Sequence, residues 1–212
     1  MLQNRVSPNG SIIRTAARGA WLGNRGVIHN EDKEIVRPFT IKAWIICMLE
    51  FRGRHREIMQ PGLWTELFFL DEATAFSAGH RPCFQCRYKD HIRFKQCWIQ
   101  GNPQYSFDMK TSIKSIDDII HAERIGSNRI KTTYTEQIKN LPDGTFINNN
   151  DESYLLSESR LYHWTPYGYD RSENAFPEEP VEVLTPHSIV NAFKAGYNPQ
   201  IDKTAGNTGS MS

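Results

Sequence analysis

Hydrophobic and polar residues alternate along residues 40–54, and this alternation predicts a β-strand. A period of two places alternate side chains on one face, so we expect the face that carries Cys47 to point into the protein. After a turn at Pro61 and Gly62, residues 63–70 predict a second, largely buried strand. The residues that share the first face are Ile41, Ala43, Ile45, Cys47, Leu49 and Phe51.

Capping residues mark the ends of several expected helices. Asp71 suits the N-cap of a helix over residues 72–78, and Gly79 suits its left-handed end. A second helix is expected over residues 87–99.

Two further helices are expected later in the chain. One begins at Ser115, where Ser115 and Asp118 can form a capping box, and continues to residue 126. Thr185 is expected to cap a last helix over residues 186–196, with proline at its first position and glycine at its end.

The C-terminal third changes to a strand pattern. Residues 141–147, 153–164 and 180–184 predict strands that are joined by Asp-Gly and Ser-Glu-Ser turns. The Gly- and Ser-rich tail, residues 203–212, is expected to be frayed.

The composition is that of a globular protein without a membrane anchor. The 212 residues are 39% hydrophobic and 23% charged, and no apolar run has the length of a signal peptide or a membrane span. We therefore expect a cytoplasmic protein with no membrane partner. The net charge of +1 requires any nucleic-acid surface to be a local patch. Four cysteines are too few for a disulfide scaffold in a chain of this length.

A Cys-x-x-Cys pair stands within AGHRPCFQC, residues 78–86. This spacing lets the thiolates of Cys83 and Cys86 meet one tetrahedral Zn²⁺, and it predicts a zinc knuckle. The alternatives are two buried free cysteines or a thioredoxin-like dithiol. The dithiol lacks its usual context, because a predicted helix precedes the pair.

The run DEATAFSAGHRPCFQC, residues 71–86, resembles the end of the small zinc domain of Ada-type DNA alkylation repair proteins. The resemblance implies that Cys83 and Cys86 are zinc ligands beside a surface that faces DNA. That family takes two more ligands from an upstream Cys-x-x-x-Cys, one of which accepts a methyl group. Only Cys47 lies upstream here, so methyl transfer is not predicted.

The third and fourth zinc ligands are sought among isolated cysteine and histidine residues that belong to no paired motif. Cys47 is the candidate third ligand, with a small core residue as the alternative. His29 is the candidate fourth ligand, and His55 or His91 can replace it. Together these residues would make a closed structural site for Zn²⁺.

Basic residues cluster around the knuckle and predict phosphate contacts with nucleic acid. Trp64, Tyr88 and Trp98 could stack on bases. The alternative is a solvated basic face with core aromatics. The basic candidates are Arg52, Arg54, Arg56, Arg81, Arg87, Lys89 and Arg93.

The segment SIDDIIHAERIG contains His121 and Glu123, which can be compared with the zinc deaminases. Those enzymes use a His-x-Glu helix and a Pro-Cys-x-x-Cys helix around one zinc, with the glutamate as proton shuttle. Here the two motifs stand in the reverse order, so only a convergent site is conceivable. The alternative places both residues on a helix surface, with Arg124 paired to an acid.

These patterns predict an α+β fold. Residues 1–105 would form a zinc-knuckle domain with a small mixed sheet and flanking helices. Residues 106–212 would add a helix, a β-rich region and a C-terminal helix, either separately or within one domain. The predicted function is nucleic-acid binding with a structural zinc, in DNA repair, modification or defence. A zinc-dependent hydrolase or deaminase-like enzyme and a protein-interaction module are the alternatives.

Overall fold

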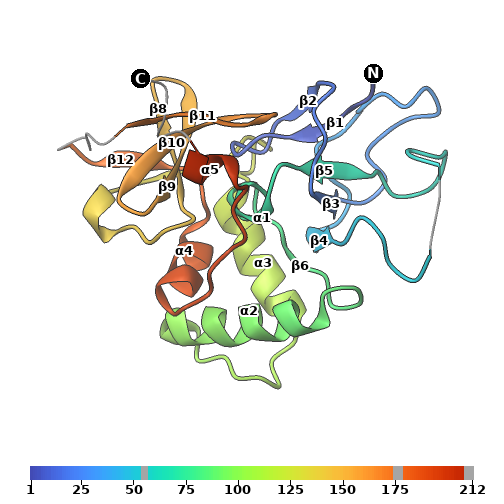
Figure 1. Ribbon diagram of the computed structural model, residues 1–212. Helices are drawn as coiled ribbons and strands as arrows, with labels where there is room; N and C mark the ends of the chain where they lie inside the picture. Colours follow the sequence, from blue (N-terminus) through green and yellow to red (C-terminus); the bar gives the residue numbers. More distant parts are fainter. Residues whose placement is uncertain (54–56, 174–178, 208–212) are drawn as a thin grey trace.

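The first sheet of the computed structural model is built by the N-terminal half of the chain (Figure 1). The model describes residues 1–53, 57–173 and 179–207. The strands lie in the order β2-β1-β5-β3-β4-β6, with the pairs β1/β5 and β4/β6 parallel and the other neighbours antiparallel. The small mixed sheet is thereby confirmed. Its strands are β1 (Gln3–Val6), β2 (Ile12–Arg14), β3 (Trp21–Asn24), β4 (Ile45–Cys47), β5 (Leu67–Phe69) and β6 (Arg81–Pro82).

The predicted strand over residues 40–54 is much shorter than expected, and its buried face was assigned wrongly. Only Ile45–Cys47 forms β4, and the residues packed into the core are Trp44 and Ile46. The opposite face, which includes Cys47, borders a cavity instead. Alternation reveals that a strand has two faces, but the elements packed on each face decide which one is the core.

The second sheet is antiparallel throughout, in the order β11-β10-β9-β8-β12-β7. Glu158 and Ser159 both have positive φ in the turn between β9 and β10, which confirms the predicted Ser-Glu-Ser turn. The strands β7 and β11 were not predicted. The second sheet comprises β7 (Tyr134–Glu136), β8 (Phe146–Asn149), β9 (Glu152–Ser157), β10 (Arg160–Thr165), β11 (Gly168–Glu173) and β12 (Val181–Val183).

In the described residues, five α-helices connect and support the sheets. The predicted cap of α1 is confirmed, since the Asp71 carboxylate accepts from the Thr74 amide at 2.8 Å, and Gly79 has φ +81° after the helix. The helices are α1 (Glu72–Ser77), α2 (Tyr88–Gly101), α3 (Ile113–Arg124), α4 (His187–Lys194) and α5 (Thr204–Asn207), with 3₁₀ turns at Pro103–Tyr105 and Ile138–Asn140.

Three predicted helix details were wrong. The side chain that caps α3 is Ser112, one turn before Ser115. The hydroxyl of Thr185 accepts the Phe146 amide of β8 and does not cap α4. Residues 204–207 form α5 where a frayed tail was expected.

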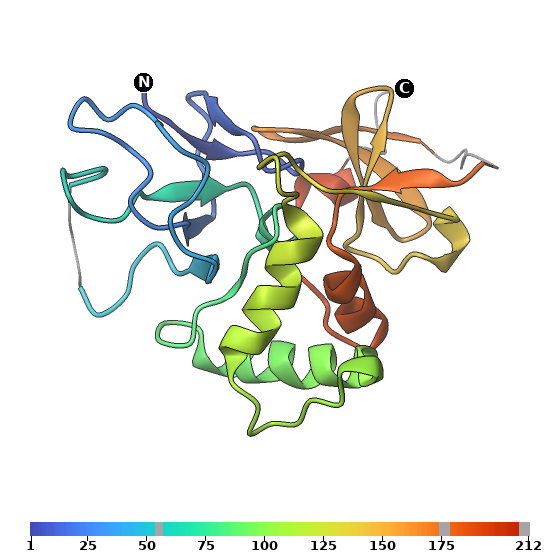
Figure 2. The ribbon, with the colours of Figure 1, turned by 180° about the vertical axis from the view of Figure 1, so that it is seen from behind.

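The main hydrophobic core joins residues from both sides of position 105. Phe76 of α1, Phe94 of α2, Ile116 of α3 and Phe193 of α4 belong to one buried cluster with the first sheet. Both views show α2, α3 and α4 gathered on one side of the two sheets (Figures 1 and 2). Helix α4, from the C-terminal half of the chain, thus completes the core beside the first sheet.

Candidate metal centre

Two parallel strands bring the cysteines together. In the pairing of β4 with β6, Ile46 lies opposite Pro82, and the Cys83 amide donates to the Ile46 carbonyl at 2.9 Å. Cys47 ends β4 and Cys83 follows β6, so the two sulfurs meet at the same end of the pair. A tight turn then leads through Cys86 into α2, closed by the Arg87 amide donating to the Cys83 carbonyl at 3.1 Å.

The sulfur atoms of Cys47, Cys83 and Cys86 all lie within 4.8 Å of one another. Sulfurs on one tetrahedral Zn²⁺ are roughly 3.8 Å apart, because the Zn–S distance is about 2.3 Å. The Gln85 amide also donates to Cys83 Sγ at 3.3 Å, which favours a thiolate there. The three thiols are therefore placed to hold one metal ion.

The three sulfurs influence one another's protonation. Hydrogen bonds from Cys47 and Cys86 lower the pKa of Cys83 far below its ordinary value. Hydrogen bonding to Cys83 and Cys86, together with burial, raises the pKa of Cys47. Three neighbouring thiolates repel one another without a cation, so a divalent ion among them would favour the deprotonated form of all three.

The histidines considered as fourth ligands lie elsewhere. The ring nitrogens of His29 lie 2.6 Å from the Thr65 hydroxyl oxygen and 3.2 Å from the Gln60 carbonyl oxygen, outside the cysteine group. His91 Nδ1 lies 3.1 Å from the Pro82 carbonyl oxygen, also outside the group. His55 falls outside the described residues. Within the described ranges, the group consists of the three cysteines.

A cavity of about 450 Å³ borders the cysteine group. Its wall is mostly apolar, and Glu66 and Gln85 add polar groups. Sequence reasoning missed this cavity, because residues from four separate segments line it. They include Leu22, Ile45, Met48, Leu49, Phe51, Ile58, Trp64 and Phe68 beside the three cysteines.

Two of the predicted phosphate-binding arginines are buried in ion pairs. Arg81 holds both carboxylate oxygens of Asp117 at 2.7 Å, and Arg87 pairs with Glu72 at 2.7 Å while stacking on Trp21. Their side chains are 6% and 4% exposed, so their prediction as surface residues was wrong. These pairs join the knuckle to α3 and α1.

Exposed groups remain beside the cysteines. Arg52, Lys89 and Arg93 are exposed, whereas Arg54 and Arg56 fall outside the described residues. Phe84 and Tyr88 are 59% and 54% exposed, with ring centroids 5.2 Å apart. Of the other aromatics named as base-stacking candidates, Trp98 is fully buried and Trp64 lines the cavity.

His121 and Glu123 lie outside the cysteine group and hydrogen-bond to other residues. Glu123 Oε2 accepts the amide of Ser188 at 3.0 Å and its hydroxyl at 2.6 Å, at the start of α4. His121 Nδ1 lies 2.8 Å from Arg124 Nη2, and neither His121 nor Glu123 joins the cysteine group. Burial, with Arg124 next, lowers the pKa of His121 to about 4.

No family model, curated protein or solved structure matches this chain. None of the helices in the described ranges is both long and apolar enough to cross a membrane. The geometry around the cysteines therefore has to support the functional interpretation by itself.

Proposed function

We propose that this chain is a zinc-binding protein in which Cys47, Cys83 and Cys86 hold one structural Zn²⁺. The observation that carries the proposal is the approach of three sulfurs from two distant segments to within 4.8 Å of one another. Thiolates are soft ligands that select zinc over magnesium or calcium. The resemblance of residues 71–86 to an Ada-type zinc domain points to the same metal.

The zinc would join β4, β6 and the start of α2. Because the site forms only when these segments are folded, the binding free energy would add to the free energy of folding. The fourth position would take a nitrogen or oxygen donor, such as water.

Metal analysis and X-ray absorption test the site. We expect about one zinc per chain, with three sulfur neighbours near 2.3 Å. Cys47→Ser, Cys83→Ser and Cys86→Ser should each lower zinc content and melting temperature. Cys97→Ser is the matched control, since Cys97 is half-buried on α2 outside the group. Full zinc content in Cys83→Ser would overturn the proposal.

We further infer that the protein binds nucleic acid through the exposed face of the knuckle. The exposed Phe84 and Tyr88 offer surfaces on which bases can stack, and Lys89 and Arg93 stand on the adjoining helix. Arg52 adds a third cation from the loop after β4. Such a combination of aromatic and cationic groups suits single-stranded or unpaired nucleic acid.

Fluorescence anisotropy with labelled single-stranded and duplex DNA tests this role. Replacing Lys89 and Arg93 together by alanine should reduce the slope of log affinity against log salt by roughly 1 to 2. Lys139→Ala with Arg160→Ala removes the same charge from exposed sites near the second sheet and should leave the slope unchanged. Equal losses in both double variants would contradict this interface.

A further inference from the structure

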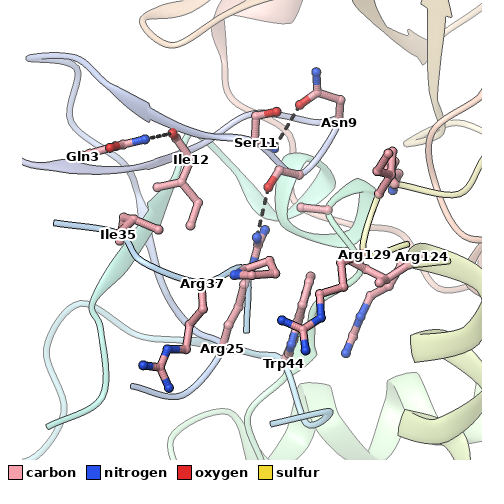
Figure 3. Close-up of a pocket in the computed structure, with 16 residues that line it drawn as sticks. Gln3, Asn9, Ser11, Ile12, Arg25, Ile35, Arg37, Trp44, Arg124 and Arg129 are labelled. Carbon is pink, nitrogen blue, oxygen red and sulfur yellow. Dashed lines mark hydrogen bonds between the residues drawn. The ribbon is translucent and has the colours of Figure 1, made fainter. Parts of the chain in front are cut away.

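A second cavity, of about 510 Å³, lies at the opposite end of β4 from the cysteines. Asn24 of β3 pairs with Ile45, and the next residue beyond each, Arg25 and Trp44, lines this cavity. Figure 3 shows arginines from several segments gathered around Trp44. Among the described residues that line the cavity none is acidic, and five are cationic: Arg25, Arg37, Arg124, Arg129 and Lys131.

Arg25 carries a buried charge, and its hydrogen-bond partners among the described residues are not carboxylates. It is 3% exposed, and it donates through Nη1 to the Gly10 carbonyl at 3.0 Å and through Nε to His80 at 3.3 Å. Its Nη2 has no hydrogen-bond partner in the described part of the chain. Burial lowers the pKa of Arg25, but a guanidinium still keeps its proton near neutral pH.

Arg124, like Arg25, is a buried guanidinium that stacks on Trp44 and has one nitrogen without a hydrogen-bond partner among the described residues. It is 1% exposed, and it donates to the carbonyls of Gly79 and Lys42 at 2.6 Å, while its Nε has no partner among the described residues. The two guanidinium carbons lie 4.1 Å and 3.7 Å from the Trp44 ring centroid. Arg124 was expected to pair with an acid if its helix face was exposed, and it is buried against carbonyls instead.

Lys131 adds a third inner cation. Its ammonium donates to the Ser77 carbonyl at 2.6 Å. Burial, followed by the charges of Arg25 and Arg124, lowers the pKa of Lys131. Among the described residues, none of these three cations lies within ion-pair distance of a carboxylate. Asp117 is the acid whose charge acts on Arg124, and both its oxygens are held by Arg81.

The contrast with the knuckle indicates what this cavity lacks. Buried Arg81 and Arg87 each have a carboxylate, which offsets the cost of removing a charge from water. In the part of the chain that the structure describes, Arg25, Arg124 and Lys131 have no such counterion, and two more arginines, Arg37 and Arg129, are exposed at the cavity wall. Their side chains hydrogen-bond to no residue that the structure describes, so their donors are available.

We propose that this cavity binds the phosphate group of a nucleotide-sized ligand. The phosphate would accept hydrogen bonds from Arg37 and Arg129 and be held by the positive field of the inner cations. Ile12, Ile35 and Ile130 supply an apolar wall for the organic part. A cavity of 510 Å³ has the size of a small-molecule site. The phosphate can come from a mononucleotide or from the phosphorylated end of a nucleic-acid strand.

Isothermal titration calorimetry on the zinc-loaded protein tests the proposal. The probes are pyrophosphate, adenosine monophosphate, adenosine diphosphate and adenosine, together with a short single strand with and without a 5′-phosphate. We expect each phosphate-bearing probe to bind more tightly than its phosphate-free partner. The mononucleotide and the strand end are told apart by which binds more tightly.

Variants at the wall and inside the cavity locate the binding. Arg37→Ala with Arg129→Ala should weaken adenosine diphosphate binding by about tenfold or more, since charge-assisted hydrogen bonds are lost. Lys139→Ala with Arg160→Ala is the control of equal charge, expected to bind as the parent does. Lys131→Met should weaken binding yet raise the melting temperature of the free protein, because it removes a partly buried charge that has no carboxylate partner among the described residues.

The calorimetry distinguishes a phosphate-binding cavity from a group of cations that binds no ligand. Equal affinity for adenosine and adenosine diphosphate, or unchanged affinity in the Arg37/Arg129 double variant, would overturn the proposal. So would an absence of binding by every probe. The site stands apart from the knuckle face, so its failure leaves zinc content and the effect of Lys89 and Arg93 on DNA binding untouched.

Discussion

Arg81 and Asp117 form a two-point ion pair, at 2.7 Å for each hydrogen bond, in a place where both side chains are almost fully buried. Arg81 lies two residues before Cys83, and Asp117 lies on α3. The pair therefore connects the cysteine knuckle to the helix that passes behind it. A residue predicted from the sequence to contact phosphates is part of the scaffold that positions the three cysteines.

Arg81→Ala should destabilise the protein by about 3–5 kcal/mol, because it leaves the Asp117 carboxylate buried without a partner. Urea unfolding monitored by circular dichroism measures this change. Lys89→Ala, at an exposed position of α2, should stay within about 0.5 kcal/mol of the parent. A loss for Arg81→Ala as small as that for Lys89→Ala would mean that the buried pair contributes little.

Glu123→Ala should lower the free energy of unfolding by about 1 kcal/mol. The carboxylate accepts the amide and hydroxyl of Ser188 in the first turn of α4, so its loss leaves a helix N-terminus uncapped. Thermal unfolding provides the measurement. An unchanged melting temperature, combined with loss of a zinc-dependent activity, would instead support the enzymatic alternative for His121 and Glu123.

Removal of the metal should loosen the knuckle without dismantling the second sheet. A chelator should lower the melting temperature and increase amide exchange at β4, β6 and the start of α2, since the three cysteines join these segments. Hydrogen exchange with mass spectrometry resolves the regions. Exchange rising equally in β9 and β10 would contradict a local role for the metal.

Sulfate binding to the cationic cavity should weaken as pH rises above about 7. Burial, followed by Arg25 and Arg124, lowers the pKa of Lys131 to about 7. The ammonium is therefore charged below that pH and attracts the anion, and it is neutral above it. Sulfate keeps its two charges throughout, so calorimetry from about pH 6 to pH 9 isolates the protein's titration. The trend should vanish in Lys131→Met.

The lowered pKa of Lys131 also predicts how the free energy of unfolding depends on pH when no anion is present. Lys131 titrates near 10.5 in the unfolded chain and near 7 in the folded one, so the unfolded state binds more protons between these values. The contribution of Lys131 to the free energy of unfolding should therefore rise with pH across this window. Comparing the pH dependence of urea unfolding in the parent and in Lys131→Met measures it.

Much of the local structure could be read from the sequence, because it depends on neighbours along the chain. The Asp71 cap, the left-handed Gly79 and the Ser-Glu-Ser turn follow from the conformations that these residues prefer, and all are present. The α+β class followed from the same local signals. The cap of α3 was misplaced because the helix begins one turn earlier, where the Ser112 side chain accepts the Lys114 amide. The cap of α4 was misplaced because Glu123, from α3, accepts the Ser188 amide.

The candidate metal site likewise combines residues that the sequence predicts with one that only the fold brings to them. The close spacing of Cys83 and Cys86 made them candidate ligands from sequence alone, since three residues of chain hold their sulfurs near each other. Cys47 joins them only because β4 pairs with β6. His29 gave no comparable signal, and the fold engages it with Thr65.

The Asp71 cap, the turn at Glu158 and Ser159 and the Cys-x-x-Cys pair could be predicted from the chain alone, because they are set by short-range geometry. Which charges are buried depends on the tertiary fold. The fold buries Arg81 and Arg87 beside carboxylates, and it brings Arg25, Arg124 and Lys131 to one cavity where none of the described lining residues is acidic. The reason is physical: the cost of a buried charge depends on what lies beside it in space, and residues far apart in the chain supply those neighbours.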